Sequence, residues 1–257
     1  MKKTKAKIKE KLILPNTRII DLSLYFKKEK ILVIADLHLG YEEAMNKEGI
    51  FIPRMNFDDC RKRMQKIFLE LKEKEGIDKK NKLEKIIILG DLKHEFGGIS
   101  EQEWNEVILM LEFLSLYCRE IVLVQGNHDN ILGPIAKWKN MEIVPHYYLK
   151  DKKILFLHGH KMKFSKEFIE AKILVIAHEH PAISLREGVK KEKYKCFLKG
   201  KYEKKELIVL PSILSITEGA DVLNKKLLSP FLQGELDEFE TWIVEDKIYY
   251  FGKIKNL

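Results

Sequence analysis

Short runs of aliphatic residues alternate with longer amphipathic segments along the first half of the chain. Three runs, at 30–36, 84–91 and 120–129, are aliphatic almost without interruption, which predicts buried strands. The segment 57–76 carries apolar residues at helical spacing and ends in Gly76, and 100–118 opens with Ser100 and Glu103, the pair of a capping box. This alternation predicts parallel strands joined by crossover helices.

The second half of the chain carries more strand-like runs and little helix between them. The runs lie at 152–160, 172–180, 194–200, 205–212, 238–246 and 247–253. The last two alternate around Glu245 and Asp246, which predicts a hairpin and a second, more antiparallel sheet. Residues 210–239 show no clear periodicity, and we expect an irregular loop region that lies beside the substrate or contacts another subunit.

Length and composition fit one domain with a large core. The chain has 257 residues, of which 45% are hydrophobic and 33% charged, and no linker rich in proline, glycine or serine divides it. We therefore expect residues 1–257 to form a single domain, with a frayed, lysine-rich segment at 1–11.

The net charge of +8 at pH 7 is weak evidence for a nucleic-acid partner. Lysine supplies 41 of the 47 basic residues and arginine only six. Proteins that read bases favour the bidentate guanidinium group of arginine. Lysine with abundant glutamate is instead typical of the surface of a heat-adapted protein, so the composition indicates a thermophile.

The cysteines and the apolar runs bear on where the protein works. Cys60, Cys118 and Cys196 lie far apart and form no C-x-x-C pair, so we expect no disulfide framework and a reducing compartment. The apolar stretch after the basic start is too short for an export signal, and no run approaches the length of a membrane span. We expect a soluble, cytoplasmic protein without a membrane partner.

Polar side chains that suit metal ions follow five of the predicted strands. Seven of the eight histidines lie there, and only His146 lies elsewhere. The residues, strand by strand, are Asp36 and His38; Asp91 and His94; Asn127, His128 and Asp129; His158 and His160; and His178 and His180. Because the carboxyl ends of strands in an open α/β sheet converge on one crevice, we expect these side chains to lie together.

Histidine, aspartate and asparagine without cysteine are the donors that Mn²⁺, Fe²⁺, Zn²⁺ or Ni²⁺ accept. A lone buried histidine is usually an ordinary core residue. That explanation fits one histidine but not five strand ends, because burying so many ionisable groups without a ligand would be costly. The sequence therefore predicts a metal centre.

The motifs "DLH", "GDLKH", "GNHD", "HGH" and "HEH", in that order, resemble those of the calcineurin-like metallophosphoesterases. The resemblance covers about 31–180. Within that family the chain is similar to small phosphoesterases related to the SbcD nuclease, which include archaeal SbcD-related proteins and bacterial ligase-associated DNA-damage-response endonucleases. It implies an α/β fold of four layers, αββα, in which two packed mixed β-sheets are flanked by α-helices and hold a dinuclear metal site at one end.

The resemblance also implies a role for each motif residue. The first metal would take Asp36, His38 and His180. The second would take Asn127, His158 and His178. Asp91 would bridge the two ions, His128 would be a catalytic histidine that binds no metal, and Asp129 would orient His128.

Some residues depart from the family pattern or keep more than one interpretation. Ala177 stands where the family has glycine, and since alanine tolerates positive φ poorly we expect ordinary β backbone there. Three roles are open for His94: it supports a metal ligand, contacts phosphate or lies on the surface. Two roles are open for His160: it faces the substrate or supports a metal ligand. Arg54 and Lys93 contact phosphate or, as we favour, are solvated surface charges.

The resemblance implies hydrolysis of phosphodiesters by metal-bound hydroxide, with two divalent ions, Mn²⁺ being our first choice. DNA, RNA or a nucleotide is the substrate that we favour. The first alternative is a phosphodiesterase for a small molecule such as a cyclic nucleotide or a nucleotide diphosphate ester, and the second is a scaffold without catalysis. The oligomeric state stays open, a homodimer included.

Overall fold

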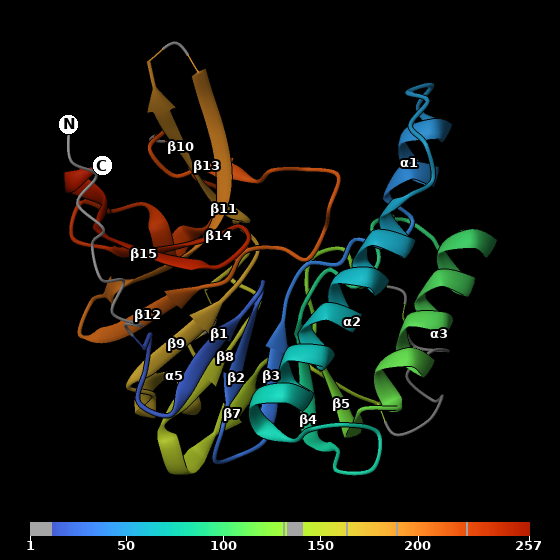
Figure 1. The fold of residues 1–257 in the computed structure, drawn as a ribbon, viewed down its shortest axis with the longest axis horizontal. Helices are drawn as coiled ribbons and strands as arrows, with labels where there is room; N and C mark the ends of the chain where they lie inside the picture. The colour runs from blue at the N-terminus through green and yellow to red at the C-terminus, as the bar shows by residue number, and fades with distance from the viewer. Residues whose placement is uncertain (1–11, 131, 133–140, 163, 189, 225) are drawn as a thin grey trace.

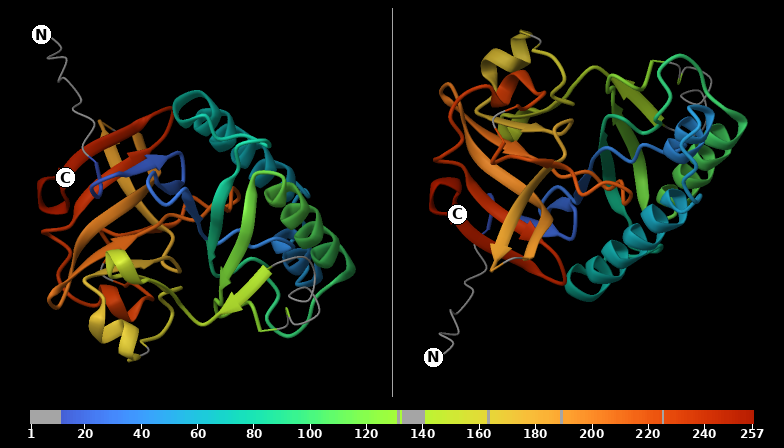
Figure 2. Two further views of the ribbon diagram at one scale, coloured as in Figure 1. Left: turned by 90° about the horizontal axis from the view of Figure 1, so that it is seen from below. Right: turned by 90° about the horizontal axis from the view of Figure 1, so that it is seen from above.

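Two β-sheets pack face to face in the protein, and the long helices cover the outer face of the first (Figures 1 and 2). The computed structural model describes residues 12–130, 132, 141–162, 164–188, 190–224 and 226–257. The predicted fraying of 1–11 lies outside these residues. None of the helices in the described ranges is long and apolar enough to cross a membrane.

The first sheet has six strands in the order β1-β2-β3-β4-β5-β6. These are β1 (Thr17–Ile20), β2 (Ser23–Phe26), β3 (Ile31–Ile34), β4 (Leu83–Leu89), β5 (Cys118–Val124) and β6 (Met141–Val144). Strands β1 to β3 pair antiparallel, and β3 to β6 pair parallel. The three predicted aliphatic strands are confirmed as β3, β4 and β5. Because they are neighbours and parallel, their carboxyl ends lie side by side.

The two predicted helices are confirmed as α2 (Asn56–Glu75) and α3 (Glu101–Ser115), and a short helix α1 (Tyr41–Lys47) precedes them. Helix α2 buries Cys60, Met64, Ile67, Phe68 and Leu71 along one stripe and is capped by Gly76. Gly76 has a φ of 68°, a value that glycine adopts without strain. Helix α3 is capped by Ser100, whose hydroxyl accepts from the Glu103 N–H at 3.1 Å. The Glu103 carboxylate does not complete the expected capping box, because it accepts the backbone N–H groups of His94 and Glu95 instead.

The second sheet runs β13-β10-β11-β12-β9-β8-β7, and β14 joins it by pairing with β11 and β15. Its elements are β7 (Tyr147–Leu149), β8 (Ile154–Phe156), β9 (Ile173–Ile176), β10 (Pro181–Glu187), β11 (Lys190–Tyr202), β12 (Lys205–Val209), β13 (Ala220–Asp221), β14 (Glu240–Val244) and β15 (Ile248–Lys253). The predicted hairpin is β14–β15. The sheet is mixed, since β9 pairs parallel with both β8 and β12.

Alternation along the strands of the second sheet divides its side chains between two cores. Phe156 and Val175 belong to the large core between the two sheets, whereas their neighbours Leu155 and Leu174 belong to a core on the outer face. Residues from α5 (Lys166–Glu170), from η2 (Pro230–Leu232) and from 222–239 complete that outer core. The fourth layer is therefore mostly the irregular region that the sequence predicts within 210–239, with little helix.

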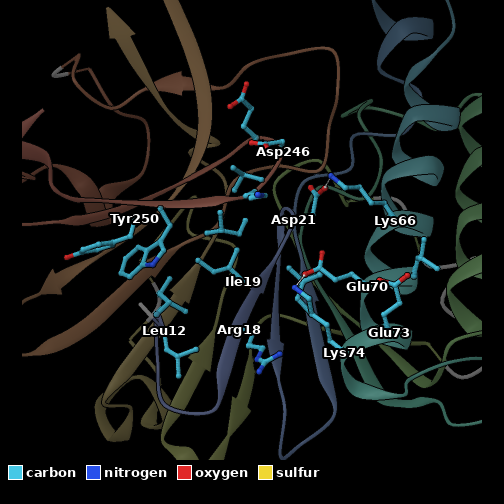
Figure 3. A pocket seen from close by; sticks show the side chains of 18 residues that line it. Leu12, Arg18, Ile19, Asp21, Lys66, Glu70, Glu73, Lys74, Asp246 and Tyr250 are labelled. Atoms are coloured by element: carbon cyan, nitrogen blue, oxygen red, sulfur yellow. Dashed lines mark hydrogen bonds and ion pairs between the residues drawn. The ribbon is translucent and has the colours of Figure 1, made fainter. Parts of the chain in front are cut away.

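A groove of about 560 Å³ opens between α2, β1 and the β14–β15 hairpin (Figure 3). Its lining includes the apolar side chains of Ile19 and Trp242 and the charged side chains of Lys66, Glu70 and Asp246. None of the residues that the sequence predicts as ligands lines it. The groove is therefore separate from the strand ends.

A candidate metal centre at the strand ends

The chain bends sharply where the predicted ligands leave their strands. Asp36, His38, Asp91, His178 and His180 all have positive φ, between 44° and 70°. They make up half of the ten non-glycine residues in the described ranges that do so. Residues held in this sparsely populated region cost free energy and cluster at functional sites. Ala177 is not among them, as expected, because the left-handed turn falls on the next residue, His178.

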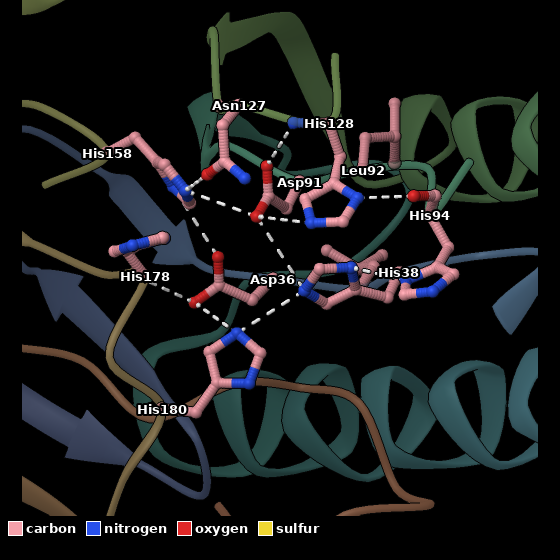
Figure 4. Close-up of polar contacts among 12 residues, drawn as sticks. Asp36, His38, Asp91, Leu92, His94, Asn127, His128, His158, His178 and His180 are labelled. Carbon is pink, nitrogen blue, oxygen red and sulfur yellow. Dashed lines mark hydrogen bonds and ion pairs between the residues drawn. The ribbon is translucent and has the colours of Figure 1, made fainter. Parts of the chain in front are cut away.

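One group of converging side chains contains Asp36, His38 and His180 (Figure 4). Oδ2 of Asp36 lies 3.3 Å from Nε2 of His180, and the Nε2 atoms of His38 and His180 lie 3.3 Å apart. Oδ1 of Asp36 is buried and accepts no hydrogen bond from the described residues. Two ring nitrogens that face each other, one of them beside a carboxylate oxygen, fit a cation between them.

A second group contains Asp91, His158 and His178, with Asn127 beside it (Figure 4). Nε2 of His158 lies 3.2 Å from Oδ2 of Asp91 and 3.1 Å from the amide oxygen of Asn127. In each group the candidate ligand atoms lie within 4.8 Å of one another. The two groups contain six of the seven predicted ligands, and the structure places the seventh, Asn127, at the second group.

Asp91 lies between the two groups. Its Oδ2 atom is 3.7 Å from Nε2 of His38 and 3.2 Å from Nε2 of His158, which belong to different groups. Its Oδ1 atom accepts the backbone N–H of His128 at 3.0 Å. A Cβ atom at Gly126 would overlap that carboxylate, so the close approach requires glycine.

The electrostatics of Asp91, His38 and His178 favour a bound cation. Burial opposes ionisation of Asp91, but the hydrogen bond and charge of His158 outweigh it and hold the pKa of Asp91 well below its usual range. Burial and the neighbouring His180 lower the pKa of His38 well below its usual value. Burial, followed by the charge of His158, lowers the pKa of His178 to about 4. Ionised aspartate and neutral imidazole are the forms that bind metal.

His128 is buried beside Asp91 and contacts its partners through both ring nitrogens. Nε2 lies 3.9 Å from Oδ2 of Asp91, and Nδ1 is hydrogen-bonded to the carbonyl oxygen of His94. Because a carbonyl only accepts, Nδ1 carries the proton and Nε2 faces the candidate metal centre.

The prediction that Asp129 orients His128 is wrong. The Asp129 carboxylate accepts the backbone N–H groups of Leu92 at 3.0 Å and Gly126 at 2.9 Å. It therefore fixes the loops after β4 and β5 against each other. The carbonyl of His94 takes the orienting role, because it is this group that meets the imidazole of His128.

His94 lies against the site and not on the surface. Its Nδ1 atom is 3.2 Å from Nδ1 of His38, and its ring centroid is 5.1 Å from that of His128. When Nε2 of His38 is a ligand, Nδ1 of His38 carries a proton that His94 can accept. Of the three interpretations of His94, support of a ligand fits the geometry best.

The remaining predicted residues lie in three different environments. His160 has a buried Nδ1 atom with no hydrogen-bond partner in the described ranges, and it lines a cavity of about 350 Å³ that Asn127 and His158 also line. Arg54 is exposed and pairs with Glu43 at 2.6 Å, which fits a surface charge. The same prediction for Lys93 is wrong, because Lys93 is fully buried and its ammonium group donates to the carbonyls of Glu95 and Gly98.

Three buried polar residues brace the site loops, a role that was predicted from the sequence for none of them. Asn56 donates to the carbonyls of Leu37 and His38, at 3.2 and 3.3 Å. Glu103 accepts the N–H groups of His94 and Glu95, and Glu179 accepts those of Leu228 and Ser229. The position of Glu179 between two predicted ligands was the only hint.

Comparison with known proteins gives one family and several similar folds. The family model described as calcineurin-like phosphoesterase matches residues 29–233. The crystal structure of the Pseudomonas putida nuclease MPE is 17% identical, with a TM-score of 0.60, over 91% of this chain and 94% of that one.

Two other solved structures are less alike. The phosphoesterase YfcE from E. coli is 13% identical over 82% of this chain and 86% of its own, with a TM-score of 0.37. Vps29 from Entamoeba histolytica, complexed with zinc, is 15% identical over 88% and 94%, with a TM-score of 0.34. No curated protein matches the sequence.

Proposed function

The chain belongs to the calcineurin-like phosphoesterase family, and we propose that it hydrolyses phosphodiester bonds in nucleic acid or nucleotides with two divalent metal ions. The observation that carries this proposal is the position of Asp91. One carboxylate oxygen faces a histidine of each group, at 3.7 and 3.2 Å, as a ligand shared by two cations would. A protein of similar fold, MPE, is a nuclease, which supports the same substrate class.

The ligand set that we propose follows the two groups. Asp36, His38 and His180 would hold one ion, and Asn127, His158 and His178 would hold the other. Asp91 would be a ligand of both. When bound, a pair of divalent ions supplies positive charge for the phosphoryl oxygens and lowers the pKa of water. The donors contain nitrogen and oxygen but no sulfur, and Mn²⁺ is therefore our first choice among Mn²⁺, Fe²⁺, Zn²⁺ and Ni²⁺.

His128 is the residue that we propose as the general acid. Its Nδ1 proton is committed to the carbonyl of His94, so Nε2 is the nitrogen that meets the substrate. A proton on Nε2 is attracted by the Asp91 carboxylate 3.9 Å away. Transfer of that proton to the leaving oxygen would allow an alkoxide to depart as an alcohol.

The loops that carry these residues are held before a substrate arrives. The Asn56 amide donates to the carbonyls of Leu37 and His38. Asp129 links the loops after β4 and β5. Ser229 donates to the carbonyl of Gly159 at 2.9 Å, while its N–H binds Glu179. Ser229 therefore joins the two loops that carry His158 and His178. Such bracing favours catalysis, because a preorganised site does not reorganise during the reaction.

The test is a substrate screen of the purified protein loaded with Mn²⁺. The panel holds single- and double-stranded DNA and RNA, cyclic nucleotides and nucleotide diphosphate esters, each with an EDTA control. We expect hydrolysis of nucleic acid or dinucleotides that Asp91→Ala abolishes and Lys74→Ala retains, because Lys74 pairs with Glu70 on α2, outside the two groups. Cleavage of small nucleotides alone would favour the small-molecule alternative, and no cleavage of any diester would favour the scaffold.

A further inference from the structure

The ring of Phe96 packs on the imidazole of His128. The two ring centroids lie 3.7 Å apart, and the planes meet at 33°. The Phe96 side chain is nevertheless 53% exposed, whereas His128 is buried. One part of the phenyl ring thus covers the histidine, and the rest faces solvent at the edge of the candidate metal centre.

The loop that carries Phe96 is anchored on both sides of it. The buried ammonium group of Lys93 donates to the carbonyls of Glu95 and Gly98, which flank Phe96 and Gly97. The buried carboxylate of Glu103 accepts the N–H groups of His94 and Glu95, at 2.8 and 2.9 Å. Burying a lysine and a glutamate is costly unless their hydrogen bonds are made. The structure therefore holds an exposed phenyl ring in a fixed position.

Exposed aromatic rings in fixed positions bind planar groups well. Stacking of a base on an aromatic side chain contributes about 1–3 kcal/mol, and it tolerates any base because each has a π-face. A phenyl ring offers no hydrogen bond with which to choose among bases. Phe96 also touches His128, which the proposed function makes the proton donor to the leaving oxygen, so a group stacked on Phe96 lies on the leaving side.

We propose that Phe96 is a specificity-determining residue that stacks on the base of the leaving nucleoside, without preference among bases. This inference rests on the proposed function, and it defines the substrates as diesters with a planar group beside the leaving oxygen. The group that stacks on Phe96 is a nucleobase and not a sugar or an alkyl chain.

The experiment compares two diesters that differ only in that base. One is dithymidine phosphate, and the other carries a tetrahydrofuran spacer in place of the leaving nucleoside. Three proteins are measured: wild type, Phe96→Leu, which still covers His128, and Phe251→Leu, a matched exposed phenylalanine on β15. We expect wild type and Phe251→Leu to prefer the complete dinucleotide by roughly 5- to 150-fold in kcat/KM, and Phe96→Leu to lose most of that preference.

Equal losses on both diesters would overturn the inference, because Phe96 would then only position His128. An unchanged preference in Phe96→Leu would also overturn it. Binding of the corresponding methylphosphonates in EDTA keeps the two proposals apart. If wild type binds the methylphosphonate with the base more tightly, and Phe96→Leu does not, stacking is supported even when no diester is hydrolysed. Hydrolysis of both diesters at equal rates by wild type refutes stacking and leaves the proposed function intact.

Discussion

Nε2 of His158 lies 3.2 Å from Oδ2 of Asp91, and both side chains are buried. Burial alone would lower the pKa of His158, but the hydrogen bond and charge of Asp91 raise it to about 9. Without a cation, the pair is thus an ion pair inside the protein. A metal ion that takes both ligands would replace the shared proton, and its binding would release that proton.

We expect Asp91→Ala to lose more activity than Asp36→Ala or His178→Ala. Asp91 faces both groups, whereas each of the other two belongs to one. Loss of a residue that merely supports a metal ligand lowers activity about 10–100-fold. We expect the activity of Asp91→Ala to lie at least that far below the activity of the other two variants. Rates at saturating Mn²⁺ provide the measurement, and Lys74→Ala is the control. Similar residual rates in all three variants would argue against a shared ligand.

His128→Gln should keep both metal ions and lose rate according to the leaving group. A nitrophenolate leaves without a proton, but the alkoxide of a nucleoside is far more basic. General acid catalysis contributes about 10²–10⁴-fold, so we expect a loss of that order on a dinucleotide and a much smaller loss on bis(4-nitrophenyl) phosphate. The loss should fall mainly in kcat. Loss of bound metal in this variant would instead identify His128 as a ligand.

The three cysteines should not react in the folded protein. Burial raises the pKa of Cys60 and of Cys118 to about 12, and it raises that of Cys196 further. Because the thiolate is the reactive form, Ellman's reagent at pH 8 should titrate no thiol in the native state and all three in guanidinium. One rapidly reacting thiol in the native protein would show that a cysteine is accessible.

Lys195 should make the stability of the metal-free protein depend on pH. Its ammonium group donates to the carbonyls of Ser212 and Leu214, and burial lowers its pKa to about 7. Between pH 7 and about 10.5 the unfolded chain holds a proton that the folded chain has lost, so this residue raises the free energy of unfolding with pH. The slope is at most about 1.4 kcal/mol per pH unit.

Urea denaturation in EDTA at pH 7 and pH 9 measures this contribution as a difference between wild type and Lys195→Met. The wild type should gain about 1–2 kcal/mol more than the variant over that interval. Parallel pH profiles for the two proteins would mean that Lys195 keeps its proton in the folded state.

The strands and the convergence of the site were predictable because their causes are local. Continuous aliphatic runs form buried strands, and parallel neighbours such as β3 and β4 place Asp36 and Asp91 at one edge. The order of the motifs then accounts for which side chains meet.

The bracing of the site was not predictable, because it consists of hydrogen bonds from side chains to backbone groups of distant segments. Glu103 has the sequence position of a capping residue, yet its carboxylate serves His94 and Glu95. Lys93 has the charge of a surface residue, yet it is buried and donates to backbone carbonyls of the loop that follows it. The residue types alone do not show whether such a side chain makes these buried contacts or faces solvent.

The number of metal ions bound by each chain tests the central claim most directly. Protein purified without chelator is titrated with Mn²⁺, and bound metal is determined by elemental analysis for wild type and for Asp91→Ala. We expect wild type to approach two equivalents and Asp91→Ala to bind one or none. A wild-type plateau at one equivalent, unchanged in Asp91→Ala, would contradict a dinuclear site with Asp91 as the shared ligand.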